Sequence, residues 1–125
     1  VVNRTYEKAE AVRSSLGSAV HPARREDVPR LLKGAGLLAN STSLGMTGKD
    51  PLTIDLSPMA ANAVVGDAIN VPLKTPLLAQ AEQRGFATSN GLDMLLHQAV
   101  RGFHLWFGVK PQVTKELRDL LVATF

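Results

Sequence analysis

The first candidate for chemistry is the tripeptide Asn3-Arg4-Thr5, which follows two valines and precedes a segment of helical composition. In a dinucleotide-binding fold the end of the second strand faces the adenine ribose, and a cation there accommodates a 2′-phosphate. Arg4 offers a planar fork of donors to such a phosphate, and Lys8, one helical turn later, offers a second charge. Thr5 and the amides of the first helical turn add neutral donors. The alternative is an ordinary helix start with a solvated arginine, which the tripeptide alone favours because short motifs match by chance.

A second polar stretch, from Asn40 to Met46, follows a short apolar run. Small hydroxyl side chains such as Thr42 and Ser43, followed by Gly45, let a ligand approach the backbone at the carboxyl edge of a sheet. The alternative is a plain polar loop. A serine hydrolase is not indicated, because the sequence contains no Gly-x-Ser-x-Gly elbow.

A third candidate opens a long segment with an apolar stripe: Gly91 and, seven residues later on nearly the same helical face, Gln98. A glycine admits a flat ring close to the backbone, and a glutamine amide binds a substrate hydroxyl. The alternative is a helix start with one satisfied, partly buried glutamine. His97 and His104 lie on the same segment, but a separation of roughly 10 Å along a helix is too long for a shared metal. With no cysteine and no HExxH motif, we expect no metal site.

The segments that must position these residues alternate short β-like runs with helices, which predicts an α/β layer structure. Capping residues and glycine or proline boundaries predict helices over 5–16, 27–33, 77–84, 92–107 and 114–122, with Thr5, Thr75 and Thr114 at their starts. Apolar runs predict strands at 1–2, 37–40, 63–67 and 86–88, and the 37–40 strand is expected to be buried.

Composition narrows the class of protein. Of 125 residues, 45% are hydrophobic and 20% are charged, which predicts one packed domain and excludes disorder. No apolar run is long enough for a membrane span, so we expect no membrane partner. The net charge of +3 is scattered and has few aromatic residues beside it, so no nucleic-acid partner is expected. The absence of cysteine fits a reducing cytoplasm.

Taken together and in this order, the segments resemble shikimate dehydrogenase. The matching strings are Asn3-Arg4-Thr5 with Lys8, 40–46 (NSTSLGM), 75–78 (TPLL), 90–95 (NGLDML) with Gln98, and 103–108 (FHLWFG). Each string alone is weak evidence for the resemblance. Five strings in the right order and spacing are strong evidence, and they cover essentially the whole chain.

The resemblance implies an oxidoreductase that uses NADP to interconvert shikimate and 3-dehydroshikimate in aromatic biosynthesis. It also implies roles for individual residues. Asn3, Arg4, Thr5 and Lys8 would hold the adenosine 2′-phosphate, Thr42 and Ser43 would line the cofactor groove, Ala68 and Gly91 would lie near the nicotinamide, and Asn70 and Gln98 would face the substrate.

Three departures from the family pattern accompany the resemblance. The family's catalytic lysine and aspartate belong to an N-terminal substrate domain that this chain lacks, and its glycine-rich pyrophosphate loop is missing too. A tyrosine that contacts substrate in the family is replaced by Asn70, which keeps hydrogen bonding but loses the ring. We therefore expect residues 1–125 to be a truncated, partial NADP-binding domain of a cytoplasmic enzyme, inactive by itself.

The expected fold is three-layer α/β/α, an incomplete Rossmann-like domain with a mostly parallel sheet that lacks its first strand. Loss of this central strand is expected to leave a gap between the 37–40 and 63–67 strands. Because the edges of the gap would present unpaired amides and carbonyls, we expect copies of the chain to form a homo-oligomer. Two alternatives stay open: a non-catalytic nucleotide-binding or interaction domain left after loss of the catalytic half, and a relative that acts on quinate or an aminoshikimate.

Overall fold

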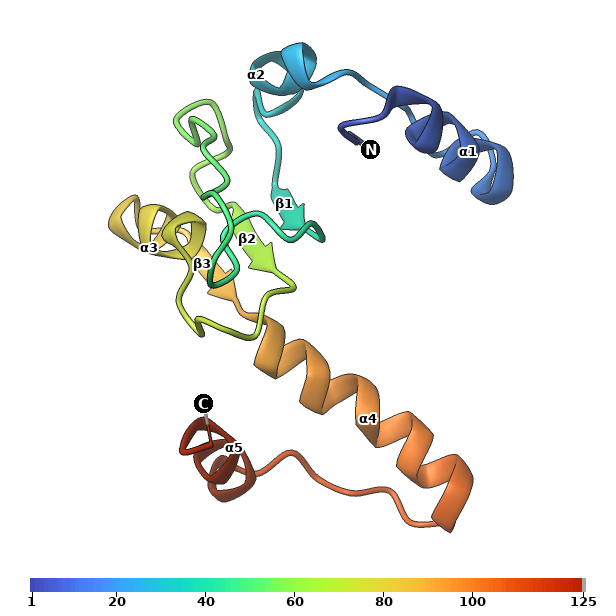
Figure 1. Ribbon diagram of the computed structural model, residues 1–125, viewed down its shortest axis with the longest axis vertical. Coiled ribbons are helices and arrows are strands. Elements are labelled where there is room, and N and C mark those ends of the chain that lie inside the picture. The colour runs from blue at the N-terminus through green and yellow to red at the C-terminus, as the bar shows by residue number, and fades with distance from the viewer. Residues whose placement is uncertain (125) are drawn as a thin grey trace. The chain divides into compact units, whose positions relative to one another are not determined.

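The computed structural model describes residues 1–124 and divides the chain into two compact units (Figure 1). The first unit comprises residues 1–35 and 55–60, and the second comprises residues 36–54 and those from 61 onward. The first unit is helical, whereas the second contains the sheet. Within residues 1–124, no helix combines the length and the apolar character that crossing a membrane requires.

Helix α1 (Tyr6–Leu16) opens the first unit and has the extent that the sequence predicts. It ends because Gly17 adopts a φ of 93°, a left-handed conformation that glycine reaches without steric cost. The predicted strand at residues 1–2 is reduced to a single parallel bridge between Val2 and Ala23. The chain thus turns back beside its own start, within the first unit.

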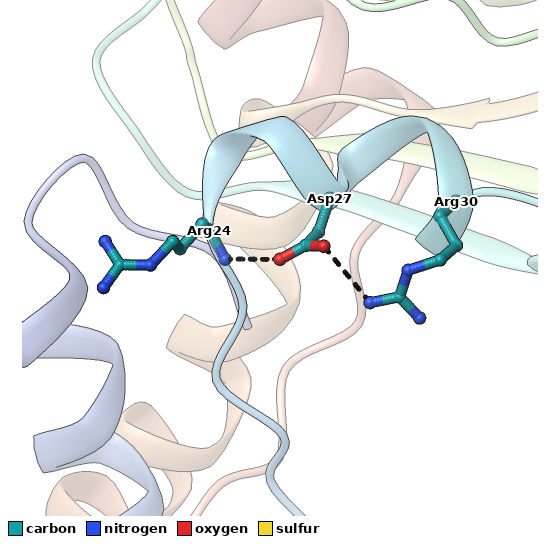
Figure 2. Close-up of polar contacts among 3 residues, drawn as sticks. All are labelled: Arg24, Asp27 and Arg30. Carbon is teal, nitrogen blue, oxygen red and sulfur yellow. Dashed lines mark hydrogen bonds and ion pairs between the residues drawn. The ribbon is translucent and has the colours of Figure 1, made fainter.

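Asp27 organises the turn that leads from the 3-10 helix η1 (Arg25–Asp27) into helix α2 (Val28–Leu31) (Figure 2). Its Oδ2 accepts a hydrogen bond from the backbone N–H of Arg24 at 3.2 Å, and its Oδ1 accepts one from Arg30 at 3.3 Å. These two hydrogen bonds, chiefly the one from the Arg24 backbone, hold the pKa of the Asp27 carboxyl below its ordinary value. The helix predicted over 27–33 is confirmed in position, with a shorter α-helical part.

The second unit is built on a parallel sheet. Its strands are β1 (Leu37–Asn40), β2 (Val64–Asp67) and β3 (Ala87–Ser89), in the order β1-β2-β3. Leu37 pairs with Val64, and Asn40 pairs with Asp67 at the carboxyl ends of the two strands. Three of the predicted strands and the parallel α/β class are therefore confirmed.

Two expectations about β1 are wrong. No gap separates β1 from β2, because the two strands pair directly along their length. The segment between them is long enough for the crossover that parallel neighbours require. The strand is not buried either: β1 is an edge strand, and Leu37 is 64% exposed. Its registered partner Val64, on the same face of the sheet, is exposed as well.

Helix α3 (Pro76–Gln83) contacts β2 and β3 and forms the core of the second unit with them. The Thr75 hydroxyl accepts a hydrogen bond from the Leu78 N–H at 3.3 Å, and Pro76 occupies the first helical position. Leu77 and Leu78 are buried, as is Val65 on β2. The predicted cap, proline and apolar stripe are confirmed.

Helix α4 (Gly91–Phe107) leaves the end of β3, and helix α5 (Lys115–Val122) follows it. The Asn90 side chain caps α4 by accepting from the Asp93 N–H at 3.0 Å. The Asp93 carboxylate in turn accepts a hydrogen bond from Nε of Arg118 on α5, at 2.8 Å. This half-exposed ion pair connects α5 to the beginning of α4.

Burial along α4 is confined to its beginning. The buried residues of the helix are Gly91, Leu92 and Leu96. Near its other end, Leu105 is 72% exposed and Trp106 is 80% exposed. The second half of α4 thus presents an uncovered apolar surface.

Candidate functional site

The four predicted phosphate ligands lie together at the start of α1. Asn3, Arg4, Thr5 and Lys8 are all exposed. The Asn3 side-chain oxygen accepts a hydrogen bond from the Thr5 N–H at 2.9 Å, which fixes the turn into the helix. Neither Arg4 nor Lys8 forms an ion pair with a carboxylate of residues 1–124. Both cations are therefore available to an anion.

Thr5 occupies the N-cap position of α1, but its hydroxyl makes no capping hydrogen bond, contrary to the sequence-based expectation. The first amides of the helix consequently lack a side-chain acceptor. The positive end of the helix dipole is left open, and the Thr5 hydroxyl remains a possible donor. This arrangement suits a negatively charged ligand group.

A further cation reaches the start of α1 from a distant part of the sequence. Val2 and Ala23 form a parallel bridge. Asn3 follows Val2 and Arg24 follows Ala23, so these two residues lie level with one another. The guanidinium carbon of Arg24 lies 4.4 Å from the centroid of the Tyr6 ring, at the first position of α1. Sequence reasoning missed Arg24, because one bridged residue leaves no strand pattern. The basic pair at 24–25 was the only available signal.

A buried polar cluster, made of Asn40, Asp67 and Thr75, joins the carboxyl ends of β1 and β2 to the start of α3. All three side chains are almost fully enclosed. The Asp67 carboxylate accepts hydrogen bonds from Nδ2 of Asn40 at 3.1 Å, from the hydroxyl of Thr75 at 2.7 Å and from the backbone N–H of Ile69 at 3.2 Å. The cluster thereby fixes the loops that follow both strands.

Thr42 and Ser43 lie on the first of these loops and differ in their partners. The Thr42 hydroxyl donates to Oδ1 of Asn40 at 2.8 Å and accepts from the Leu44 N–H at 3.1 Å. Within the described part of the chain, the Ser43 hydroxyl has no hydrogen-bond partner, and Ser43 is exposed. Ser43 is thus the free donor of the predicted pair, whereas the Thr42 hydroxyl holds the loop.

The second loop brings Ala68 and Asn70 against the beginning of α4. The Gly91 N–H donates to the Ile69 carbonyl at 3.1 Å. A Cβ at Gly91 would lie 2.4 Å from both the Ala68 carbonyl oxygen and Oδ1 of Asn70. That Asn70 oxygen is buried and lacks a donor among residues 1–124. Three predicted site residues therefore lie together here.

Gln98 is not part of this group. It is exposed two turns further along α4, and no hydrogen bond joins it to the other described residues. Nor do the described residues gather three potential metal ligands of the His, Cys, Asp or Glu type in one place.

Each unit by itself offers groups that suit one part of a phosphorylated nucleotide cofactor. The first unit offers unpaired cations beside an uncapped helix start, which suit a phosphate. The second unit offers a free hydroxyl at Ser43 and an orphaned acceptor at Asn70 beside a glycine without room for a side chain. Uncharged polar groups of this kind suit an amide and a ribose.

The chain is similar to proteins named shikimate dehydrogenase. A family model described as "Shikimate 5'-dehydrogenase C-terminal domain" matches residues 91–115. A protein named Shikimate dehydrogenase (NADP(+)), from Rhodopseudomonas palustris strain TIE-1, is 57% identical over 98% of this chain, which spans 44% of that protein.

Two solved structures share the fold at low sequence identity. A quinate dehydrogenase from Corynebacterium glutamicum in complex with NAD has a TM-score of 0.84 and 26% sequence identity to this chain. The match covers 98% of this chain and 45% of the quinate dehydrogenase chain. A shikimate 5-dehydrogenase from Thermus thermophilus, in complex with NADP(H) and shikimate, has a TM-score of 0.74 and 27% sequence identity to this chain. The match covers 90% of this chain and 41% of the Thermus chain. The chain thus spans less than half the length of these relatives.

Proposed function

Because this chain is homologous to the NADP-dependent shikimate dehydrogenase family over 98% of its length, we propose that it is a partial NADP-binding domain of such an enzyme. The complete enzyme would interconvert shikimate and 3-dehydroshikimate, with the cofactor supplying or accepting the hydride. The observation that carries the proposal is the pair of unpaired cations, Arg4 and Lys8, at the uncapped start of α1. A cytoplasmic location is supported by the absence of cysteine.

Each predicted residue has a role in this proposal. Asn3, Arg4, Thr5 and Lys8 bind the adenosine 2′-phosphate, Thr42 and Ser43 line the cofactor groove, Ala68 and Gly91 lie near the nicotinamide, and Asn70 and Gln98 face the substrate. Ser43, as the free hydroxyl, is the better hydrogen-bond donor of its pair.

The proposal predicts a preference for a 2′-phosphorylated nucleotide. Titration followed by NMR should show weak binding of 2′,5′-ADP, with shifts at Arg4, Thr5 and Lys8, and weaker binding of 5′-AMP. Arg4→Ala should reduce this preference about tenfold, because a charge-assisted hydrogen bond contributes about 1.5–3 kcal/mol.

Arg13→Ala is the matched control for that titration, since Arg13 is exposed near the other end of the same helix. It should bind both nucleotides as the unmodified chain does. Equal shifts for both nucleotides in the unmodified chain, or a preference that survives Arg4→Ala, would contradict the cofactor assignment.

A second prediction concerns activity. By the family resemblance, the catalytic lysine and aspartate belong to a part of the enzyme outside these residues, and general acid-base catalysis typically contributes about 10²–10⁴ in rate. The chain prepared alone should therefore form no NADPH from NADP and shikimate above the blank. Sustained NADPH formation by a sample free of contaminating dehydrogenase would show that these residues suffice for catalysis.

A third prediction concerns self-association, which the exposed apolar surfaces support. Leu37 on the edge strand and Leu105 and Trp106 on α4 are all more than half exposed, and association would remove such apolar side chains from water. Light scattering behind a sizing column should give a mass above 13.4 kDa, and Trp106→Glu should shift the population toward monomer. His97→Glu, an exposed change on the same helix, is the control. A stable monomer of the unmodified chain would refute the expectation.

A further inference from the structure

We infer that Arg24 is a further ligand of the nucleotide 2′-phosphate, acting with Arg4 and Lys8. The inference rests on the proposed function and adds a residue to that site. It follows from the position of Arg24, from its free donors and from the ring that holds its side chain.

The position of Arg24 follows from the parallel bridge between Val2 and Ala23. In a parallel pair both chains run toward the same edge, with about 4.8 Å between neighbours. Asn3 and Arg24 each come directly after the bridge, so Arg24 and the Asn3-Arg4-Thr5 turn leave it side by side. The bridge thus brings together two cations that are twenty residues apart in the sequence.

The guanidinium of Arg24 forms no ion pair with a carboxylate of residues 1–124, although its charge acts weakly on Asp27. The nearby Asp27 carboxylate accepts hydrogen bonds from the Arg24 backbone N–H and from the Arg30 side chain. Figure 2 shows the Arg24 side chain extending away from Asp27. Among residues 1–124 no ion pair or side-chain hydrogen bond involves this guanidinium. Its donors are therefore available, like those of Arg4.

Tyr6 holds the Arg24 side chain in place. The 4.4 Å distance between the guanidinium carbon and the ring centroid is that of a stacked cation. A stacked arginine keeps its in-plane N–H groups free while it loses conformational freedom. Because Tyr6 directly follows Thr5, this contact fixes the charge beside the predicted phosphate ligands before any ligand binds.

The inference is tested by titrating 2′,5′-ADP and 5′-AMP into the unmodified chain and into Arg24→Ala, Arg24→Lys and Arg25→Ala. Arg24→Ala should weaken 2′,5′-ADP about tenfold, equivalent to about 1.4 kcal/mol, and should leave 5′-AMP unchanged. Arg24→Lys keeps the charge but loses the planar fork, so its loss should be smaller. Arg25, an exposed neighbour in the sequence, is the matched control and should bind like the unmodified chain. Thermal unfolding of each variant checks that the fold is kept, which we expect because Arg24 and Arg25 are both exposed.

The outcomes separate this inference from the proposed function. If the unmodified chain shows no preference for 2′,5′-ADP, the proposed cofactor site is wrong and the inference fails with it. If the preference exists and falls in Arg4→Ala but not in Arg24→Ala, only the inference is overturned. An equal loss for both nucleotides in Arg24→Ala also overturns it, because that result would place Arg24 on a group that the two nucleotides share and not on the 2′-phosphate.

Discussion

Replacement of Gly91 by alanine is expected to lower the free energy of unfolding by about 3 kcal/mol or more. The added Cβ would lie 2.4 Å from the Ala68 carbonyl oxygen and from Oδ1 of Asn70. The Asn70 side chain could rotate away, but the Ala68 carbonyl belongs to a backbone held by two hydrogen bonds. These run from the Ala68 N–H to Asn40 at 2.9 Å and from the Gly91 N–H to Ile69 at 3.1 Å. Urea unfolding at fixed protein concentration measures the loss.

Gly102→Ala is the matched control, because Gly102 lies on the same helix and its added Cβ would meet only the Trp106 ring, at 3.8 Å. Alanine is the better helix former, so this variant should gain about 0.5–1 kcal/mol. Similar stability changes in the two variants would show that the close approach at Gly91 is not the deciding contact.

Replacement of Asp67 by alanine should cost about 3–5 kcal/mol, since it leaves several donors without a partner in a buried place, each costing about 1–3 kcal/mol. The Thr75 hydroxyl and the Ile69 N–H would lose their acceptor, as would one N–H of Asn40 Nδ2, whose other N–H keeps the Leu44 carbonyl at 3.1 Å. Of these groups, the Thr75 hydroxyl lies on a residue with no exposed surface, so water cannot replace the carboxylate there. Urea unfolding should show the loss. The Ile69 amide should shift in NMR spectra, as should the Thr42 amide, which donates to Oδ1 of Asn40 at 3.0 Å.

Asp50→Ala provides the comparison for this variant. Asp50 lies in the exposed part of the loop after β1, and its side chain makes no hydrogen bond within residues 1–124. Its loss should change stability by no more than about 0.5 kcal/mol. If Asp67→Ala proves no more costly than Asp50→Ala, the buried polar cluster does not hold the two loops.

The threonines at helix starts show how far local sequence is informative. Thr5, Thr75 and Thr114 all precede helices and all look like caps. Thr75 and Thr114 cap their helices, and the Thr75 hydroxyl is also anchored by Asp67, a residue eight positions away. Thr5 has no comparable anchor, and its own amide is taken by Asn3. The elements themselves follow from local pattern, but the use of each side chain depends on its tertiary partners.

Which strands pair with one another could not be predicted from the sequence for a similar reason. The runs at 37–40 and 64–67 are recognisable as strands, but no local feature of either specifies the other as its neighbour. The expected gap came from a general strand order, and the direct pairing of Leu37 with Val64 overturns it. Arg24 was missed because its placement also depends on a pairing, the bridge from Val2 to Ala23. Arg4 and Lys8 could be predicted together without knowing any strand pairing, because they lie one helical turn apart in the sequence.

The two halves of helix α4 should differ in the process that opens their backbone hydrogen bonds. Its buried residues end at Leu96, so the hydrogen bonds of its first turns can open only when the core of the second unit opens. Beyond that residue the helix is a peptide of a length that is marginal in water without packing. Its amides should exchange through local fraying, in a regime set by helix–coil equilibrium and not by global unfolding. Amide protection along α4 should therefore fall after Leu96, where the helix leaves the buried core of the second unit.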